Sequence, residues 1–281
     1  MTDTTERPVR WSRPYARKPR VEASVTEVIG AMLAKNLEWG SAKETALYAV
    51  HHDDWRKLET AAAVDQLRTH FRGVWDGRAA MGTVVHAVNE AWSDGLTIDV
   101  EQMVHEMAQG ERNARTWVDR EDEVVTACMG YLDGLEAFYA KHKPILERFE
   151  AVVRTPGILI GTADWVATLA DGSRWLLDIK TTAEQDEAKG VYTDSWTLQL
   201  AAYRWATEEV FYEADARGKP QECGTSPWVS IDRAGIVHLR GDGRFELYEV
   251  EATPEWYETF CDLARACLRL KQIQPAKAVR P

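Results

Sequence analysis

The sequence predicts an α+β fold, with a mixed central β-sheet flanked by helices and additional helices at the N-terminus and inserted before the sheet. Three observations predict it. Apolar residues recur at helical spacing up to Lys143-Pro144, and from Arg148 the pattern becomes extended. After three extended stretches, another helical stretch separates the third strand from the next one, as expected for a sheet covered by helices.

Individual elements follow from the same periodicities. Helices are expected at residues 24–50, 64–75, 81–92, 100–117, 121–142 and 195–216, with a last one from Pro254 to about 272. Strands are expected at 149–154, 160–169, 174–182 and 228–233, and a hairpin around Asp242-Gly243 joins 235–240 to 244–251. The chain therefore divides into a basic arm (1–23), a helical region carrying His86 (24–147) and a sheet core with a C-terminal helix (148–281).

Composition narrows the function classes. The 281 residues carry a formal net charge of -11, which weakly disfavours nucleic acid as a partner. The charge is uneven, because the stretch 7–20 contains no acid and six bases: Arg7, Arg10, Arg13, Arg17, Lys18 and Arg20. Two interpretations stay open, a phosphate-binding arm and a disordered tail with scattered charge.

The absence of long apolar segments and of paired cysteines in the sequence indicates the compartment of the protein and the redox state of its thiols. No apolar stretch is long enough to cross a bilayer, and residues 1–20 have no apolar core like that of a secretory signal. We therefore expect a cytoplasmic protein with no membrane partner. The four cysteines form no C-x-x-C pair and predict reduced thiols rather than a zinc site.

The two central strands, 160–169 and 174–182, are expected to pair in a definite register. If the turn is Asp171-Gly172-Ser173, Trp165 faces Ile179, Ala167 faces Leu177, and Leu169 faces Trp175, which gives one apolar face. Asp164 then faces Lys180 on the other side, with Asp178 adjacent. A two-residue turn would bury Asp164 among apolar side chains at a cost of several kcal/mol, so the odd-numbered turn is favoured.

Four sequence features accompany this pair of strands. Asp164 follows Gly161-Thr162-Ala163, and Asp178-Ile179-Lys180 places an acid and a base on one side of a strand. Gln199 and Tyr203 share one face of the next helix. Upstream, Gly82-Thr83 precedes His86, with Glu90 one turn later.

In this order, the motifs G-T-x-x-H-x-x-x-E, G-x-x-D, D-x-K and Q-x-x-x-Y resemble the RecB-type branch of the PD-(D/E)XK nuclease superfamily, which includes CRISPR-associated and phage exonucleases. The resemblance spans about Gly82 to Tyr203 and implies a restriction-endonuclease-like core. Ala163 stands where the superfamily name has proline, and aspartate replaces glutamate at 178. Both departures are common in that branch.

The resemblance also implies a role for each matching residue. His86, Asp164, Asp178 and the Ile179 carbonyl would hold a metal ion, and Lys180 would act with the two aspartates in catalysis. A second group would contact DNA or support the site: Gln199, Tyr203, Glu90 and Thr181. Glu150 matches a further acidic position less securely. The expected cofactor is Mg²⁺ or Mn²⁺; an iron–sulfur cluster is not expected, because three of the four cysteines lie dispersed downstream.

These motifs imply an exonuclease acting on single- or double-stranded DNA in recombination, repair or phage DNA processing. Two alternatives remain: a structure-specific endonuclease, and a catalytically silent DNA-binding partner of recombination or replication proteins. Structural explanations also exist for each residue taken alone. His86 could be a packed core histidine, Asp164 and Lys180 an ordinary cross-strand pair, and Gln199 with Tyr203 part of a packed helix face. The sequence does not predict an oligomeric state.

Overall fold

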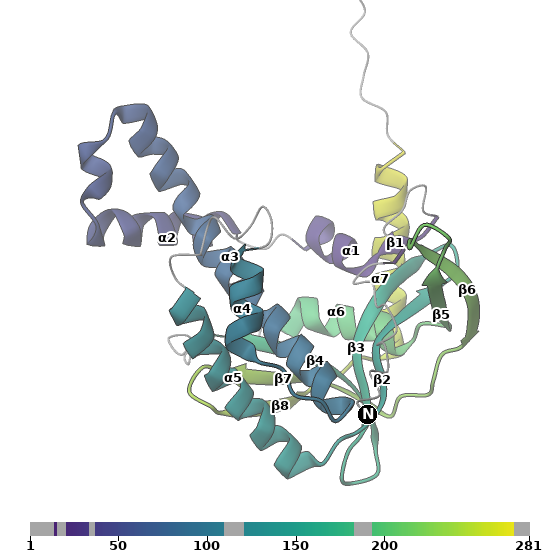
Figure 1. Ribbon diagram of the computed structural model, residues 1–281. Helices are drawn as coiled ribbons and strands as arrows, with labels where there is room; N and C mark the ends of the chain where they lie inside the picture. The colour runs from purple at the N-terminus through teal and green to yellow at the C-terminus, as the bar shows by residue number, and fades with distance from the viewer. Residues whose placement is uncertain (1–13, 16–20, 34–36, 110–120, 183–192, 273–281) are drawn as a thin grey trace, which may run out of the picture.

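The computed structural model describes residues 14–15, 21–33, 37–109, 121–182 and 193–272. Its centre is a mixed sheet in the order β6-β5-β2-β3-β4-β7-β8 (Figure 1). The strands are β2 (Ile145–Thr155), β3 (Leu159–Thr168), β4 (Arg174–Thr182), β5 (Glu208–Ala214), β6 (Pro220–Pro227), β7 (Arg233–Arg240) and β8 (Phe245–Glu249). The short β1 (Ala23–Ser24) adds to β3 in parallel, and β4 pairs with β7 in parallel. The remaining neighbours are antiparallel.

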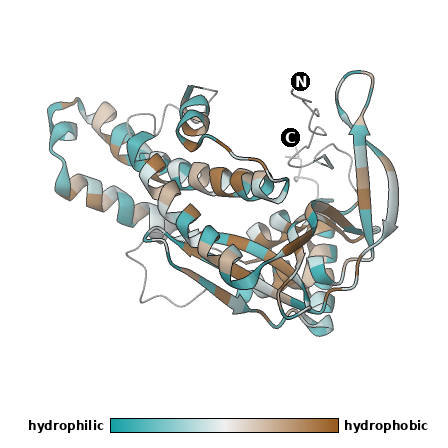
Figure 2. Ribbon diagram, turned by 60° about the horizontal axis from the view of Figure 1, so that its bottom comes forward, coloured by the Kyte–Doolittle hydropathy of each residue, from teal (hydrophilic) through white to brown (hydrophobic). Residues whose placement is uncertain are grey.

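Helices cover both faces of this sheet and bury two apolar cores. Residues of α1 (Val25–Met32), α6 (Thr193–Arg204) and α7 (Pro254–Leu270) form the first core with side chains such as Val166 and Ile236. Residues of α3 (Thr60–Ser93), α4 (Val100–Gln109) and α5 (Glu121–His142) form the second core with Trp165 and Leu177. In Figure 2 the hydrophobic residues gather where these helices face the strands. The predicted mixed sheet flanked by helices is thus confirmed.

Several predicted elements need correction. The expected helix 24–50 is two helices, α1 and α2 (Leu37–His51), with the 3₁₀ turn Asp54–Lys57 after α2. The expected helices 64–75 and 81–92 are one continuous helix, α3. The prediction of a strand at 228–233 is wrong, because β6 ends at Pro227 and β7 starts at Arg233. The end of the expected helix 100–117 and most of the basic arm lie outside the described residues.

The expected helix 195–216 is wrong beyond Arg204. Residues 208–214 form β5, which pairs with β2 on one side and β6 on the other. This segment contains Val210, Phe211 and Tyr212, residue types that suit strands. Pairing between distant segments decided its structure here, over the helical spacing of its apolar residues.

Among the described residues, no helix combines the length and apolar character that crossing a bilayer requires.

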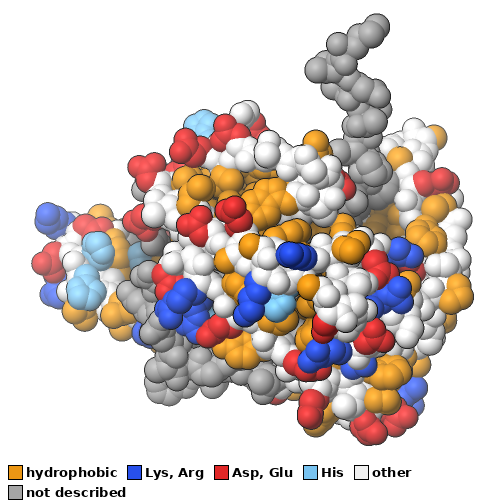
Figure 3. All heavy atoms as spheres, turned by 90° about the horizontal axis from the view of Figure 1, so that it is seen from below, with side chains coloured by type: hydrophobic (Ala, Val, Ile, Leu, Met, Phe, Trp, Pro, Cys, Tyr) orange, Lys and Arg blue, Asp and Glu red, His pale blue; other side chains and the backbone are white. Residues whose placement is uncertain are grey.

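Basic and acidic side chains alternate over the face shown in Figure 3. Ion pairs between described residues include Arg174 with Glu147 at 2.8 Å and Arg240 with Glu246 at 2.8 Å.

Candidate active site

The β3–β4 hairpin has the predicted turn length but a different turn position. Leu169 N donates to Ser173 O at 3.0 Å, so the turn is Ala170-Asp171-Gly172, one residue earlier than expected. Gly172 takes a φ of 83°, and a three-residue hairpin loop favours glycine at this last position. The register therefore shifts by two residues: Trp165 faces Leu177, and Ala167 faces Trp175.

This shift corrects the expected partner of Asp164. The ladder between β3 and β4 ends at Trp165 and Leu177, and the next residues along the two strands are Asp164 and Asp178. Asp164 therefore stands level with Asp178, whereas the register expected from the sequence places it opposite Lys180. A shift of two keeps the same residues on each face of a strand, so the predicted apolar face survives: all six of its side chains are buried in the second core.

Side-chain alternation along β3 is interrupted at Asp164. Ala163 packs in the first core, whereas Trp165, only two residues later, packs in the second. The neighbouring strand β2 has a similar interruption at Glu150, which adopts a φ of 46°. Because Phe149 pairs with Trp165 and Ala151 with Ala163, Glu150 lies level with Asp164. Glu150, Asp164 and Asp178 thus form a row of acids across three adjacent strands. Unusual backbone conformations of this kind cluster at functional sites.

Asp178 is the most enclosed member of the row, with a side chain 3% exposed. Its Oδ1 accepts a hydrogen bond from Gln199 Nε2 at 3.1 Å. Its Oδ2 is buried, makes no hydrogen bond of good geometry, and contacts Lys180 Nζ. The lysine ammonium therefore supplies the positive charge next to this carboxylate.

His86 approaches the row of acids from the face of the sheet opposite α6. It lies on α3, and its Nε2 is 3.9 Å from Asp164 Oδ2. Burial lowers the pKa of His86, and the charge of Lys180 adds to the decrease although Asp178 opposes it. A neutral imidazole, which metal coordination requires, is therefore the favoured form near neutral pH.

The other titratable groups are shifted by burial and by one another. Burial and the charge of Asp178 raise the pKa of Asp164 well above its usual value, more than Lys180 lowers it. Burial alone would lower the pKa of Lys180, but Asp178 and Asp164 together raise it above the usual value. Burial and the charge of Asp164 also raise the pKa of Tyr203 well above its usual value. The lysine is thus charged, and the tyrosine is a neutral phenol.

A pocket of about 520 Å³ opens beside the acids. Helices from both faces of the sheet contribute to it: α3 provides His86 and Glu90, and α6 provides Gln199 and Tyr203. This is possible because β3 and β4 separate beyond Trp165 and Leu177. Its other lining residues are Tyr15, Thr26, Ala79, Gly82, Thr83, Ala87, Glu150, Thr162 and Asp164.

Most of the predicted site residues are brought together around this pocket. Asp178 and Lys180 do not line the pocket themselves. Asp178 accepts a hydrogen bond from the lining residue Gln199, and Lys180 contacts Asp178. Thr181 is not among the lining residues. Its neighbour across the β4–β7 ladder, Leu239, packs in the second core, away from the face that carries Asp178. The roles of these residues, including that of the Ile179 carbonyl, stay predictions.

Tyr15 and Thr162 also line the pocket, although neither is among the residues predicted from sequence. Tyr15 is 9% exposed, packs on Val152, Ile160 and Val210, and has its hydroxyl 3.4 Å from Thr162 Oγ1. Period-two alternation from Asp164 could have identified Thr162. No local signal marks Tyr15, which sits among the bases of the N-terminal segment.

The donor atoms around the pocket suit a hard cation. In the part of the chain that the structure describes, no three His, Cys, Asp or Glu side chains already form a closed metal cluster. The site instead offers one imidazole at its edge and two carboxylates at the break in the ladder, one of which, Asp178, has a buried Oδ2 without a hydrogen bond. Such a set fits Mg²⁺ or Mn²⁺, which keep water or substrate oxygens in their coordination shell.

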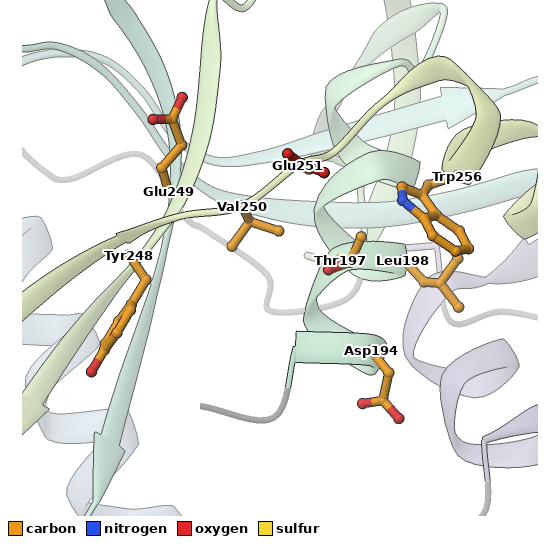
Figure 4. Close-up of a pocket in the computed structure, with 8 residues that line it drawn as sticks. All are labelled: Asp194, Thr197, Leu198, Tyr248, Glu249, Val250, Glu251 and Trp256. Carbon is orange, nitrogen blue, oxygen red and sulfur yellow. The ribbon is translucent and has the colours of Figure 1, made fainter. Parts of the chain in front are cut away.

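A second pocket, of about 510 Å³, lacks such convergence. It lies between the start of α6, the end of β8 and the start of α7 (Figure 4). Its acids, Asp194, Glu249 and Glu251, point in different directions in that view, and Glu249 is paired with Arg233. The pocket beside Asp164 is therefore the stronger candidate for a reaction site.

The chain is similar to a solved structure and matches a protein-family model. One solved structure, described as "Crystal structure of SSO0001", matches with 12% sequence identity and a TM-score of 0.35, over 92% of this chain and 79% of that one. No curated protein is detectably similar. The family model of the PD-(D/E)XK nuclease superfamily matches residues 60–275, which is more than half of the chain and includes every predicted site residue. The chain therefore belongs to the PD-(D/E)XK nuclease superfamily.

Proposed function

We propose that this member of the superfamily is a metal-dependent DNA exonuclease of the RecB-type branch, acting in recombination, repair or phage DNA processing. The observation that carries the proposal is the meeting of Asp164, Asp178, Lys180 and His86 where β3 and β4 separate, beside a pocket open to solvent. The order of motifs from His86 to Tyr203 supports the assignment to this branch.

Asp164, Asp178 and His86 would hold the divalent cation, together with the main-chain carbonyl of Ile179. Uncatalysed phosphodiester hydrolysis is so slow that a nuclease has to lower its barrier by roughly 20 kcal/mol. A divalent cation supplies Lewis acidity toward the phosphate and toward the attacking water. Mg²⁺ and Mn²⁺ both suit this mixed oxygen and nitrogen set, and the single imidazole tilts the preference toward Mn²⁺.

The surrounding side chains would position the Asp178 carboxylate and stabilise charge on the substrate. Lys180 is charged, so its ammonium can stabilise negative charge that develops on the phosphate oxygens. Gln199 holds the Asp178 carboxylate in place through its 3.1 Å hydrogen bond. Tyr203, as a buried neutral phenol in the pocket wall, can donate a hydrogen bond to a substrate oxygen. Glu90 and Glu150 line the same pocket and are further candidate ligands or supports.

The test is a cleavage assay with linear and closed circular DNA, in single- and double-stranded form, with Mg²⁺ or Mn²⁺. Asp178→Asn and Lys180→Ala should each lower cleavage of linear DNA at least about 100-fold, the scale of losing one preorganised charge. Lys219→Ala, in an exposed turn between β5 and β6, should cleave like the wild type. Undiminished cleavage by both site variants would refute the assigned site.

The substrate form separates the exonuclease from the other candidates. An exonuclease needs a free end and should leave closed circles intact, whereas a structure-specific endonuclease cuts a closed circle that contains its target structure. DNA binding without cleavage under every metal tested would instead indicate a catalytically silent binding partner.

A further inference from the structure

Helix α3 extends well beyond the active site. Its first half packs against α2, and the two helices project away from the sheet (Figure 1). From Gly40 to Arg72 no described side chain is fully buried. In Figure 3 this hairpin lies at the left edge, with basic, acidic, histidine and hydrophobic side chains exposed together. A projecting hairpin that adds nothing to either core is suited to contact something outside the chain.

One face of α3 is used for packing against α2. Tyr48 of α2 stacks on His70 with ring centroids 3.9 Å apart. Its hydroxyl also accepts a hydrogen bond from Gln66 Nε2 at 2.8 Å. Gln66 and His70 are four residues apart and therefore share a face of the helix. The opposite face of α3 is left uncovered by α2.

The uncovered face forms a continuous line to the active site. At 100° per residue, positions spaced by three, four or seven stay on one side of a helix. The exposed members of this line are Ala61, Asp65, Arg68, Arg72, Ala79 and Thr83, and the same line continues to His86 and Glu90 in the pocket. The pocket is therefore one end of a stripe that runs the length of α3.

Two cations stand on this stripe outside the pocket. Arg72 is exposed, and no ion pair joins it to another described residue. Arg68 pairs with Asp65 at 2.8 Å, but both side chains are more than 60% exposed, so the pair contributes little and a phosphate can compete for the guanidinium. At 1.5 Å rise per residue, Arg72 and Arg68 lie about 21 and 27 Å from His86 along the helix.

We propose that this stripe binds the phosphodiester backbone of the strand being cleaved, with Arg72 and Arg68 as its phosphate contacts. The inference rests on the proposed nuclease function. The distances correspond to roughly six to eight nucleotides of a stacked strand beyond the scissile bond. Because the whole chain carries a formal charge of -11, two arginines aligned with the pocket determine the path more than bulk charge does.

The test is the salt dependence of DNA binding, measured by fluorescence anisotropy in EDTA with labelled single-stranded and duplex oligonucleotides of about 20 nucleotides. Arg68→Gln with Arg72→Gln should reduce the slope of log K against log salt by about 1.4 on single strands. Near 0.1 M salt, each lost contact should weaken binding about fivefold. In the cleavage assay the double variant should raise KM and leave kcat unchanged at saturation.

Arg265→Gln is the matched control. Arg265 lies on α7 and pairs with Asp262 three residues earlier at 2.8 Å, as Arg68 pairs with Asp65. The control should keep the wild-type slope and KM. A substrate of about five nucleotides is too short to reach Arg72, so on it the double variant and the wild type should behave alike.

Two failures can be told apart. If the double variant keeps the wild-type slope and KM on long substrates, the stripe does not bind the strand, although Lys180→Ala can still abolish cleavage. If the wild-type protein binds neither form of DNA at low salt in EDTA, the stripe is refuted. If it also cleaves neither form with Mg²⁺ or Mn²⁺, the proposed nuclease function is refuted with it.

Discussion

Replacing Lys180 with methionine should destabilise the metal-free protein and make it depend on a divalent cation. Lys180 Nζ contacts Asp178 Oδ2, whose side chain is 3% exposed, and Asp164 lies beside it. Methionine keeps the aliphatic bulk but removes the charge. The two carboxyl groups then face each other without a compensating cation, or one of them takes up a proton.

The loss of unfolding free energy caused by Lys180→Met has a lower and an upper limit. Removing one partner of a buried ion pair typically costs about 3–5 kcal/mol, and the lower end applies because Lys180 is 28% exposed. Protonating one aspartate limits the loss to about 4 kcal/mol at pH 7, given an unfolded pKa near 3.9. We therefore expect about 3 kcal/mol, which for a chain of this size corresponds to a decrease in Tm of roughly 6–12 °C.

Thermal unfolding in EDTA and in Mg²⁺, followed by circular dichroism, measures this. A cation at 100 times its Kd stabilises the folded state by about 2.7 kcal/mol, so Mg²⁺ should restore most of the loss in Lys180→Met. Lys180→Arg, which keeps the charge, should stay near the wild-type Tm in EDTA. Equal Tm values for Lys180→Met and the wild type in EDTA would contradict the reasoning, as would a variant that gains no more from Mg²⁺ than the wild type does.

Two further predictions concern stability away from the site. The hydrogen bond from Arg174 lowers the pKa of Glu147. Glu147→Gln should therefore cost about 1 kcal/mol near neutral pH, and the difference in urea midpoint should vanish as pH falls below about 4, because this contribution is lost once the native carboxylate is protonated. A Cβ on Gly130 of α5 would overlap the carbonyl oxygen of Gly241, so Gly130→Ala should destabilise by about 3 kcal/mol or more. The methyl group added by Gly30→Ala on α1 meets nothing within 4 Å, so the free energy of unfolding should rise by up to about 1 kcal/mol. Similar urea midpoints for Gly130→Ala and Gly30→Ala would contradict the packing of α5 on the β7–β8 turn.

The sequence was sufficient for features that depend on short spacings. The hairpin of β7 and β8, the helix Glu121–His142 and the apolar face of β3 and β4 each follow from a local period of apolar residues. The predicted helix boundaries were wrong where tertiary contacts determine the secondary structure. Nothing near residues 76–80 shows that α3 continues as one helix, and the strand β5 exists because β2 and β6 offer partners.

Part of the candidate site could be identified in the same way. His86, Asp164, Asp178, Gln199 and Tyr203 belong to motifs with fixed spacings, and the structure brings them within one region. Tyr15 could not be identified, because it reaches the pocket from 147 residues away through its contact with Thr162. Contacts of this sequence separation leave no local pattern.

The register error shows why the correct residues emerged from an incorrect pairing. The turn position moved by one residue because Gly172 accepts the left-handed conformation at the end of the loop, and that shift moved the pairing by two. Strict alternation would still have directed Asp164 and Asp178 to one covered face of a continuous sheet. Instead the ladder stops at Trp165 and Leu177, and β2 and β3 change their alternation at Glu150 and Asp164. Asp164 can then approach His86 on one face while Asp178 approaches Gln199 on the other. The site depends on this local departure from regular β-structure, and a periodic pattern cannot encode it.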